Sequence, residues 1–506
     1  MNRPKLIFER AVDVVRRRPY EALIVAAVGF SCAYFFQGGG WNQNAHFATT
    51  VAMVEDGTVA LDRYRESTGD LSHAGNNIVS AKPIGTALVA VPAYVVARTV
   101  TLVVGNHGDR VILRCYLTTV MTAGGALVMI ALLLFRLFSR RLAPPDAALL
   151  ATAMVLATPL LPNSTMLTSH PLVALAALAA YAALAEPRAD GQELGAGRML
   201  VAGLLAGLPA CFEYMAAVLL LPLGVYALWQ ARPRHRILFF SLGVGLIALV
   251  PLTHHALVYG DPLHTGYDSL VNARFAADAE RGLMGFDGLS IHRLYQLTFG
   301  SFRGFFFLSP FLIAALPGAI RMVRDPATRP EGIVAGASAL MILLMVASLA
   351  YWHSGSAVGS RYALLFVLFS AMPIAAILVA HRIWIAIGMG VGFCFMVLAT
   401  SVTALPPPPP ARGQLPNVVV WFWQRFVNGN LASWQQAIII EDGVGAGDPT
   451  LPFAFNLGHM LGLPRLWSLL PYVVAMGGLG YAAYRLVRRQ IGERDEPCGL
   501  TEGIES

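Results

Sequence analysis

One lysine is the clearest candidate for binding a charged ligand. The chain has two lysines and 34 arginines, and Lys82 is the one that lies away from the N-terminus. It stands in Ser80-Ala81-Lys82-Pro83-Ile84, directly before a long apolar stretch. An ammonium group is a compact point charge that suits an anion such as phosphate, so Lys82 is a candidate anion ligand. A lysine that reaches toward lipid head groups would have the same sequence context.

Two carboxylates, Asp62 and Asp70, precede this lysine in polar sequence rich in turn residues. Such a carboxylate can accept a proton in catalysis, or it can cap a turn. Asp62 lies between Leu61 and the Arg63-Tyr64 pair, which predicts a less open setting than that of Asp70, which follows a glycine. The stretch 42–56 before them has apolar positions at helical spacing, so we expect a short amphipathic helix at the surface.

Further polar residues lie where apolar stretches begin or end. His170 and Glu213 are at the ends of two such stretches, and Arg303 and Arg361 each come directly before another. Polar groups at membrane depth are commonly functional. For His170 and Glu213 a structural hydrogen bond explains the position equally well, and for the two arginines anchoring at a helix end does.

The elements that must position these residues are membrane helices. Of 506 residues, 56% are hydrophobic and 13% are charged, whereas globular chains carry about 25% charged residues. A soluble fold of this composition would lack polar surface, and many apolar runs are near the ~20 residues that span a bilayer. We therefore expect an all-α, polytopic transmembrane protein. The same composition excludes disordered, collagen-like and disulfide-scaffold classes.

The net charge of +7 does not indicate nucleic acid as a partner. Arginines and lysines are scattered in short clusters between apolar stretches instead of forming one basic patch, and such clusters set the orientation of membrane proteins. The five cysteines are dispersed without CxxC or Cys/His spacing, so the sequence supports neither structural zinc nor disulfides.

The hydrophobic pattern predicts about twelve spans. The apolar stretches, besides 84–104, are 20–36, 112–135, 146–161, 170–185, 199–212, 215–230, 237–257, 304–320, 332–351, 362–380, 383–403 and 467–487. The N-terminus and the short basic loops hold 22 of the 36 lysines and arginines. The positive-inside rule therefore puts these loops and both termini in the cytoplasm.

The stretch 84–104 decides this topology. If it crosses the membrane, every later basic loop lies outside; if it does not, all of them lie inside. It contains Pro92 and Arg98, so we expect a helix at the outer face, within one large outer loop, 37–111. An ordinary span that violates the charge rule is the alternative.

These choices give a division of the chain. We expect a cytoplasmic N-terminus (1–19), a transmembrane module (20–403), an outer loop that opens with five prolines (404–466), a last transmembrane helix (467–487) and a cytoplasmic tail (488–506). No internal repeat and no pair of similar halves is visible, which disfavours solenoids and inverted-repeat transporters.

The motifs, in their order, resemble the GT-C superfamily of integral-membrane glycosyltransferases, which use polyprenyl-phosphate sugars. In the first outer loop the resemblance rests on Glu55-Asp56-Gly57, Asp62-Arg63-Tyr64, Thr68-Gly69-Asp70 and Lys82-Pro83. Farther along it rests on Thr168-Ser169-His170-Pro171, Phe212-Glu213-Tyr214, Gly260-Asp261-Pro262, Thr265-Gly266-Tyr267, Arg303-Gly304-Phe305, Ser309-Pro310, Tyr351-Trp352 and Gly359-Ser360-Arg361-Tyr362. The resemblance covers about residues 20–400. The superfamily includes the lipid A aminoarabinose transferase and the protein O-mannosyltransferases.

The resemblance implies a role for each group of residues. A carboxylate would take the proton of the acceptor hydroxyl, and Lys82, Arg303 and Arg361 would hold the donor phosphate. Residues implied to line the substrate pocket are Asn44, His170, Glu213, Tyr267 and Tyr362.

The sequence departs from the family where an acidic pair usually follows the first span. Gln43-Asn44 stands there, and an amide cannot take up a proton at useful pH. The acidic residue that often precedes the Lys-Pro is Ala81. A catalytic protein would therefore need Asp62 or Asp70 as its base, and Asp62 is the preferred candidate.

The function implied is transfer of a sugar from a polyprenyl-phosphate donor to a glycan, lipid or protein acceptor at the outer face of a bacterial inner (plasma) membrane. The polyprenyl-phosphate sugar enters as the donor substrate. No cofactor is certain, and a divalent metal is possible but has no ligand motif to support it. The missing acidic pair leaves open a non-catalytic protein, or a flippase-like protein that handles lipid-linked sugars. Sugar, acceptor and oligomeric state are not encoded in any motif.

Overall fold

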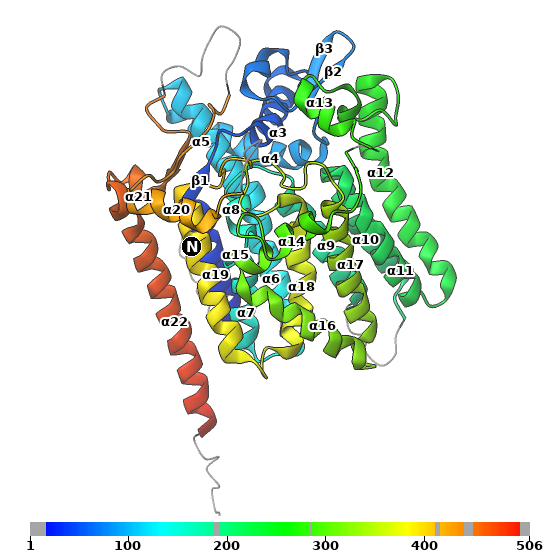
Figure 1. Cartoon of the computed structure of the whole chain (residues 1–506), viewed down its shortest axis with the longest axis vertical. Helices are drawn as coiled ribbons and strands as arrows, with labels where there is room; N and C mark the ends of the chain where they lie inside the picture. Colours follow the sequence, from blue (N-terminus) through cyan, green and yellow to red (C-terminus); the bar gives the residue numbers. More distant parts are fainter. Residues whose placement is uncertain (1–16, 186–192, 283–284, 410–414, 440–448, 496–506) are drawn as a thin grey trace, which may run out of the picture.

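Apolar stretches of the sequence form a bundle of long helices in the computed structural model, which describes residues 17–185, 193–282, 285–409, 415–439 and 449–495. The bundle helices run roughly side by side (Figure 1). They are α2 (Pro19–Tyr34), α6 (Gly125–Phe138), α7 (Pro144–Leu156), α9 (His170–Ala185), α10 (Ala196–Phe212), α11 (Leu220–Gln230), α12 (Ile237–Tyr259), α16 (Ala315–Arg324), α17 (Arg329–Ala347), α18 (Leu364–Ile377), α19 (Arg382–Val402) and α22 (Leu470–Asp495).

Several of these helices are long and apolar enough to cross a bilayer. Within the described residues the candidates are Gly85–Val103, His107–Phe138, Arg234–Tyr259, Arg329–Ala347, Arg382–Val402 and Arg465–Gln490, and shorter apolar helices accompany them. The prediction of a polytopic helical membrane protein is confirmed. Each predicted apolar stretch contains helix, whereas the number of spans stays a prediction.

Small residues let the bundle helices approach closely. A Cβ on Gly203 of α10 would lie 2.0 Å from the Phe240 carbonyl oxygen of α12, and one on Gly243 would lie 2.4 Å from the Leu200 carbonyl oxygen. Close backbone approach through glycine is how membrane helices gain packing energy when lipid is as apolar as the side chains. The close α10–α12 pair thereby positions α10, which Glu213 follows.

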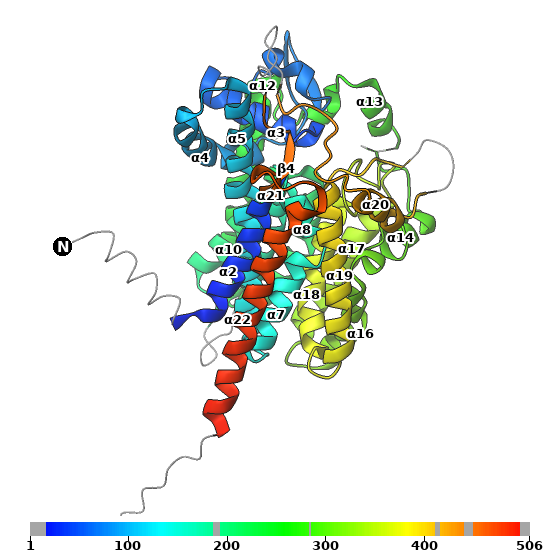
Figure 2. The same ribbon diagram turned by 90° about the vertical axis from the view of Figure 1, so that its left-hand side faces the viewer.

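A layer of shorter elements covers one end of the bundle (Figure 2). It contains α3 (Trp41–Val51), α4 (Gly85–Val100), α5 (His107–Thr119), α13 (Ala273–Ala279), α14 (Ile291–Thr298), α20 (Val418–Val427) and α21 (Leu457–Met460), with α8 (Leu160–Ser164) and α15 (Phe305–Leu308) below them. Four short strands complete it: β1 (Phe35–Gln37), β2 (Leu71–Ala74), β3 (Asn77–Ser80) and β4 (Ala454–Asn456).

The strands form two antiparallel pairs. β2 and β3 are a hairpin in which Leu71 lies opposite Ser80. β1 pairs with β4, with Phe35 opposite Asn456, so the loop 404–466 is joined to the end of the first bundle helix. The outer layer is therefore a single unit built from both ends of the chain.

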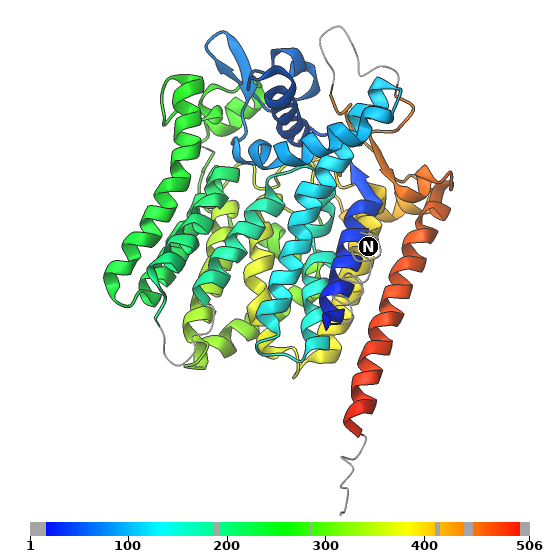
Figure 3. The same ribbon diagram turned by 180° about the vertical axis from the view of Figure 1, so that it is seen from behind.

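The helix α4 lies across the ends of the bundle helices instead of along them (Figure 3). Its length and composition would also suit a span, so its place outside the bilayer stays a prediction, which this transverse orientation supports. The first residues of α2 and the last turn of α22 lie at the opposite end of the bundle from this layer (Figure 2), as the prediction of both termini on one side requires.

The predicted helix over 42–56 forms, but it is not a surface helix. Residues 42–51 of α3 are buried, and a π-helical turn, Ala52–Asp56, continues it. Later segments cover α3, since the Asn44 amide donates to the carbonyl oxygens of Ser67 and Ala437, each at 2.7 Å. The amphipathic pattern indicated one apolar face but not the protein segments that cover the other.

Candidate functional site

A buried ion pair joins Asp70 and Lys82. Lys82 Nζ lies 3.2 Å from Asp70 Oδ1, and the side chains are 7% and 9% exposed. The hairpin explains the pair, because Asp70 comes directly before β2 and Lys82 follows β3, and the Ala81 amide donates to the Asp70 carbonyl oxygen. Burial alone lowers the pKa of Lys82, but the nearby carboxylate of Asp70 outweighs it and holds that pKa well above its usual value. The ammonium is therefore charged.

Tyr267 covers the other side of this ammonium. Lys82 Nζ donates to the Tyr267 hydroxyl at 3.4 Å and lies 5.2 Å from the centre of its ring. A capping box between Thr265 and Asp268 fixes the short turn that carries Tyr267. The loop 258–303 thus supplies one wall of the site, as the resemblance implied for Tyr267.

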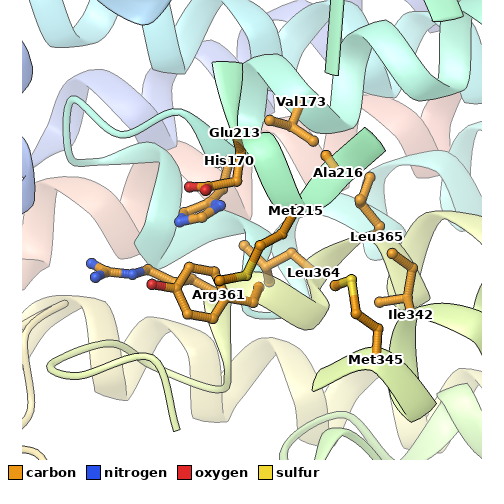
Figure 4. A pocket seen from close by; sticks show the side chains of 11 residues that line it. His170, Val173, Glu213, Met215, Ala216, Ile342, Met345, Arg361, Leu364 and Leu365 are labelled. Atoms are coloured by element: carbon orange, nitrogen blue, oxygen red, sulfur yellow. The ribbon is translucent and has the colours of Figure 1, made fainter. Parts of the chain in front are cut away.

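A narrow pocket at the top of the bundle has a polar end formed by His170, Glu213, Arg361 and Tyr362. His170 begins α9, Glu213 follows α10, and Arg361 opens the turn before α18. Figure 4 shows the carboxylate of Glu213 beside the imidazole of His170, with the guanidinium of Arg361 on the same side of the pocket. The rings of His170 and Tyr362 meet edge to face at 5.8 Å.

The polar atoms at this end of the pocket lack partners. Among the described residues, Glu213 Oε1, His170 Nε2 and Arg361 Nε are buried without a hydrogen-bond partner. Burial raises the pKa of Glu213, against the opposing effect of Lys82 and Arg361. Buried polar groups are usually satisfied, so three orphaned atoms around one pocket indicate a place for a polar ligand.

The other end of the pocket is apolar. Figure 4 shows most of the apolar side chains that line the pocket to the right of the charged groups. The apolar lining consists of Val173, Met215, Ala216, Ile342, Met345, Leu364 and Leu365. The pocket volume is about 10 Å³, so a larger ligand would have to displace flexible side chains such as the two methionines. An amphiphile with an anionic head fits this division of charged and apolar walls.

Lys82 belongs to the same electrostatic site. The charge of Lys82 acts on Glu213, and the carboxylates of Asp70 and Glu213 both act on Arg361. The structure therefore brings together Asp70 and Lys82 from the outer layer with Glu213 and Arg361 from the bundle. We call this set and its pocket the donor site, after the role that we propose for it below.

Arg303 lies beside the donor site without lining the pocket. It is fully buried, its Nη2 donates to the Gly355 carbonyl oxygen at 2.8 Å, and its guanidinium lies 4.3 Å from the centre of the Phe302 ring. Ser354 and Gly355 have positive φ values of 59° and 69°, so Arg303 holds a tightly turned loop. That loop leads to Arg361.

Asp62 is placed away from the donor site, and the expectation about its setting is wrong. Asp62 is exposed, whereas Asp70 is 6% exposed. The Asp62 carboxylate accepts from the Ile78 amide at 3.2 Å and so braces the hairpin. Local sequence could not show this, because Asp70 is buried by segments distant in the chain. Asn44 likewise has a structural role in holding the covering segments.

His46 is a site residue that the sequence reading missed. It is 2% exposed and lines a small pocket together with Lys82. Burial, together with the positive charges of Lys82 and Arg361, lowers its pKa to about 3, so it is neutral, and its Nε2 has no partner among the described residues. No local signal in the sequence indicates this, because the burial of α3 depends on segments that are distant in the chain. Among the described residues no group of three His, Cys, Asp or Glu side chains could hold a metal.

Comparison with known proteins finds neighbours among solved structures. No protein-family model and no curated protein sequence matches the chain. The chain is similar to ArnT from Cupriavidus metallidurans, both bound to undecaprenyl phosphate (17% identity, TM-score 0.47, 81% of this chain and 70% of that one) and in the apo state (16%, 0.47, 83% and 71%). It is also similar to the archaeal oligosaccharyltransferase AglB from Archaeoglobus fulgidus in complex with an inhibitory peptide and a dolichol-phosphate (10%, 0.43, 82% and 55%).

These neighbours are of the class that the sequence motifs resemble, membrane glycosyltransferases of the GT-C superfamily. At identities of 10–17% and TM-scores below 0.5, the likeness carries no argument about chemistry. The function has to follow from the residues of this chain.

Proposed function

We propose that the protein transfers a sugar from a polyprenyl-phosphate donor to an acceptor hydroxyl at the outer end of the bundle. The observation that carries this proposal is the donor site. The buried cation Arg361 stands at the polar end of a pocket whose other walls are apolar, and the charge of a second buried cation, Lys82, acts on Glu213 in that pocket. A lipid phosphate offers an anionic head to those cations and a hydrocarbon tail to the apolar walls.

The two cations would do the electrostatic part of the reaction. As the acceptor oxygen bonds to the anomeric carbon, the bond from that carbon to the phosphate oxygen breaks and its electron pair goes to the phosphate. Arg361 and Lys82 stabilise this developing charge in a site that excludes water, where such contacts are strongest. Asp70 keeps Lys82 charged and oriented.

Glu213 is the base in this proposal. A base has to be deprotonated and yet bind the acceptor proton well, which favours a carboxyl whose pKa lies above its usual value. Burial raises the pKa of Glu213, and its Oε1 is free among the described residues to receive a proton. Asp70 is engaged by Lys82, and Asp62 lies outside the donor site, so Glu213 replaces both as the first candidate.

Two measurements on one set of variants test this function. Binding of undecaprenyl phosphate to the purified protein is followed by native mass spectrometry, and the envelope glycans and glycolipids of a deletion strain are profiled after complementation. Glu213→Gln should bind the lipid but leave the glycan defect, whereas Lys82→Ala should fail in both. A strain restored by Glu213→Gln would exclude Glu213 as the base. Restoration by Glu213→Gln, Asp62→Asn and Asp70→Asn alike, but not by Lys82→Ala, would overturn transfer and favour flippase-like handling of the lipid.

A further inference from the structure

A second cavity lies in the outer layer, separate from the donor site. Its volume is about 270 Å³, compared with about 10 Å³ for the pocket of the donor site. Side chains of α3, α4, α5, the π-helical turn Ala52–Asp56 and the 3₁₀ turn Asp62–Ser67 line it, together with Ile439. Ligand pockets usually hold about 300–1,000 Å³, so this cavity suits one small ligand.

Three aromatic side chains form its apolar walls. The rings of Phe47 and Tyr94 lie 5.8 Å apart at 70°, which makes a corner, and Tyr64 adds a third wall. Aromatic faces pack well against flat, C–H-rich surfaces such as the face of a sugar ring. All three residues are 1% exposed, so packing fixes their positions, and a sugar ring would contact only the small part of each that lines the cavity.

Charged groups form the polar part of the lining and hold one another in place. Glu55 accepts from the Tyr94 hydroxyl at 2.9 Å and pairs with Arg114 at 3.6 Å. Asp56 accepts from the Tyr64 hydroxyl at 2.9 Å and from Arg63 at 3.1 Å. The two carboxylates are 24% and 26% exposed, so they keep acceptor capacity toward the cavity.

The balance of these charges indicates the class of ligand. The lining holds two carboxylates, two guanidiniums and the imidazole of His107, and Arg98 pairs with Glu55 at 2.8 Å. The cavity therefore presents paired charges of both signs instead of a cluster of unpaired cations, which a phosphate or another anion would need. Planar carboxylates and guanidiniums instead offer adjacent acceptors and donors, which match the neighbouring hydroxyls of a sugar. Aromatic walls with a balanced polar rim thus favour a neutral, polyhydroxylated ring.

The helix α3 is the wall between this cavity and the donor site. His46 lines a small pocket with Lys82, and the next residue, Phe47, lines the outer cavity. We propose that this outer pocket, defined by Phe47, Glu55, Asp56, Tyr64, Tyr94 and Arg114, binds a neutral saccharide unit. This binding does not depend on the transfer reaction proposed above.

Saturation-transfer NMR tests the proposal on the full-length protein in phosphatidylcholine nanodiscs, which avoid sugar-based detergents. The probes are methyl glycosides of glucose, galactose, mannose and arabinose. At least one glycoside should bind, and Val111→Phe, which fills the cavity, should weaken that binding at least about tenfold. Val103→Phe is the matched control, because Val103 is 91% exposed and does not line the cavity.

A second pair of variants distinguishes a specific loss of binding from misfolding of the protein. Arg63→Gln removes the partner of Asp56 and should weaken the glycoside several-fold, whereas Arg65→Gln, an exposed arginine of the same turn that pairs with Glu66, should not. The proposal is overturned if no glycoside binds, if Val111→Phe and Arg63→Gln both bind like the unsubstituted protein, or if glucuronate or phosphocholine displaces the neutral sugars at lower concentration.

Discussion

The donor site and the outer pocket use charge in opposite ways. In the donor site Lys82 and Arg361 are each less than a tenth exposed, and atoms of Arg361, Glu213 and His170 have no partner among the described residues. In the outer pocket every carboxylate pairs with an arginine and a tyrosine, and the charged side chains range from 15% to 53% exposed.

This difference matches the two roles proposed above, the transfer reaction in the donor site and ligand recognition in the outer pocket. Removing a charge from water is costly unless a partner compensates it. The free energy of folding therefore has to compensate the cost of burying these unpaired groups, and a charged ligand would supply the missing partner. Partly exposed pairs contribute little to stability, about 0–1 kcal/mol each, and their role is to hold hydrogen-bonding groups in a fixed arrangement. Strong effects of substitution are therefore expected in the donor site and graded ones in the outer pocket.

The largest effect is expected from removing the base. Glu213→Gln keeps the shape of the side chain but cannot accept the proton, so the rate of transfer should fall by about 10²–10⁴-fold with little change in donor affinity. The readout is the initial rate of product formation in membranes that contain equal amounts of each variant. Asp62→Asn is the control and should retain activity, and the reverse pattern would return the base to Asp62.

The next effect concerns the two cations. Lys82→Ala and Arg361→Ala should each weaken undecaprenyl phosphate binding by about 10- to 100-fold, because a charge-assisted hydrogen bond is worth roughly 1.5–3 kcal/mol. Arg65→Ala, an exposed arginine, should not change it. Unchanged affinity in both site variants would make Lys82 and Arg361 interfacial anchors.

A smaller, pH-dependent effect is expected for Asp70. Its carboxylate keeps the pKa of Lys82 well above the usual value, so donor binding by the unsubstituted protein should be constant up to about pH 10. In Asp70→Asn the largest effect that opposes burial is removed, so the pKa of Lys82 should fall, and binding should be lost at a lower pH than in the unsubstituted protein. The affinity for undecaprenyl phosphate is measured from pH 6 to pH 10 for the unsubstituted protein and for Asp70→Asn. If the affinity depends on pH in the same way in both proteins, Asp70 does not hold the pKa of Lys82 high.

The smallest effect on donor binding is expected for Arg303. Arg303→Lys keeps the charge but replaces the group that donates a hydrogen bond to the Gly355 carbonyl oxygen. The free energy of unfolding should therefore fall by about 1–3 kcal/mol, while the affinity for undecaprenyl phosphate should change less than about threefold. Denaturation monitored by circular dichroism and the same binding assay separate the two. A loss of affinity as large as that of Arg361→Ala would mean that Arg303 contacts the phosphate directly.

The fold could be predicted from the sequence where a single local property decides it. Apolar length predicts each bundle helix, and the rarity of lysine singles out Lys82. The pairing of Lys82 with Asp70 depends on a hairpin register that local composition does not specify, although Gly75-Asn76 between two short strands was a usable turn signal. The exposure of Asp62, the burial of α3 and the place of His46 depend on segments that are remote in the sequence.

The most direct test of the central claim is a structure of the protein with undecaprenyl phosphate in lipid nanodiscs. The account predicts phosphate oxygens about 2.7–2.9 Å from Lys82 Nζ and from the guanidinium of Arg361, with the prenyl tail between Met215 and Met345. A phosphate bound away from both cations, at the outer pocket or elsewhere in the outer layer, would contradict it.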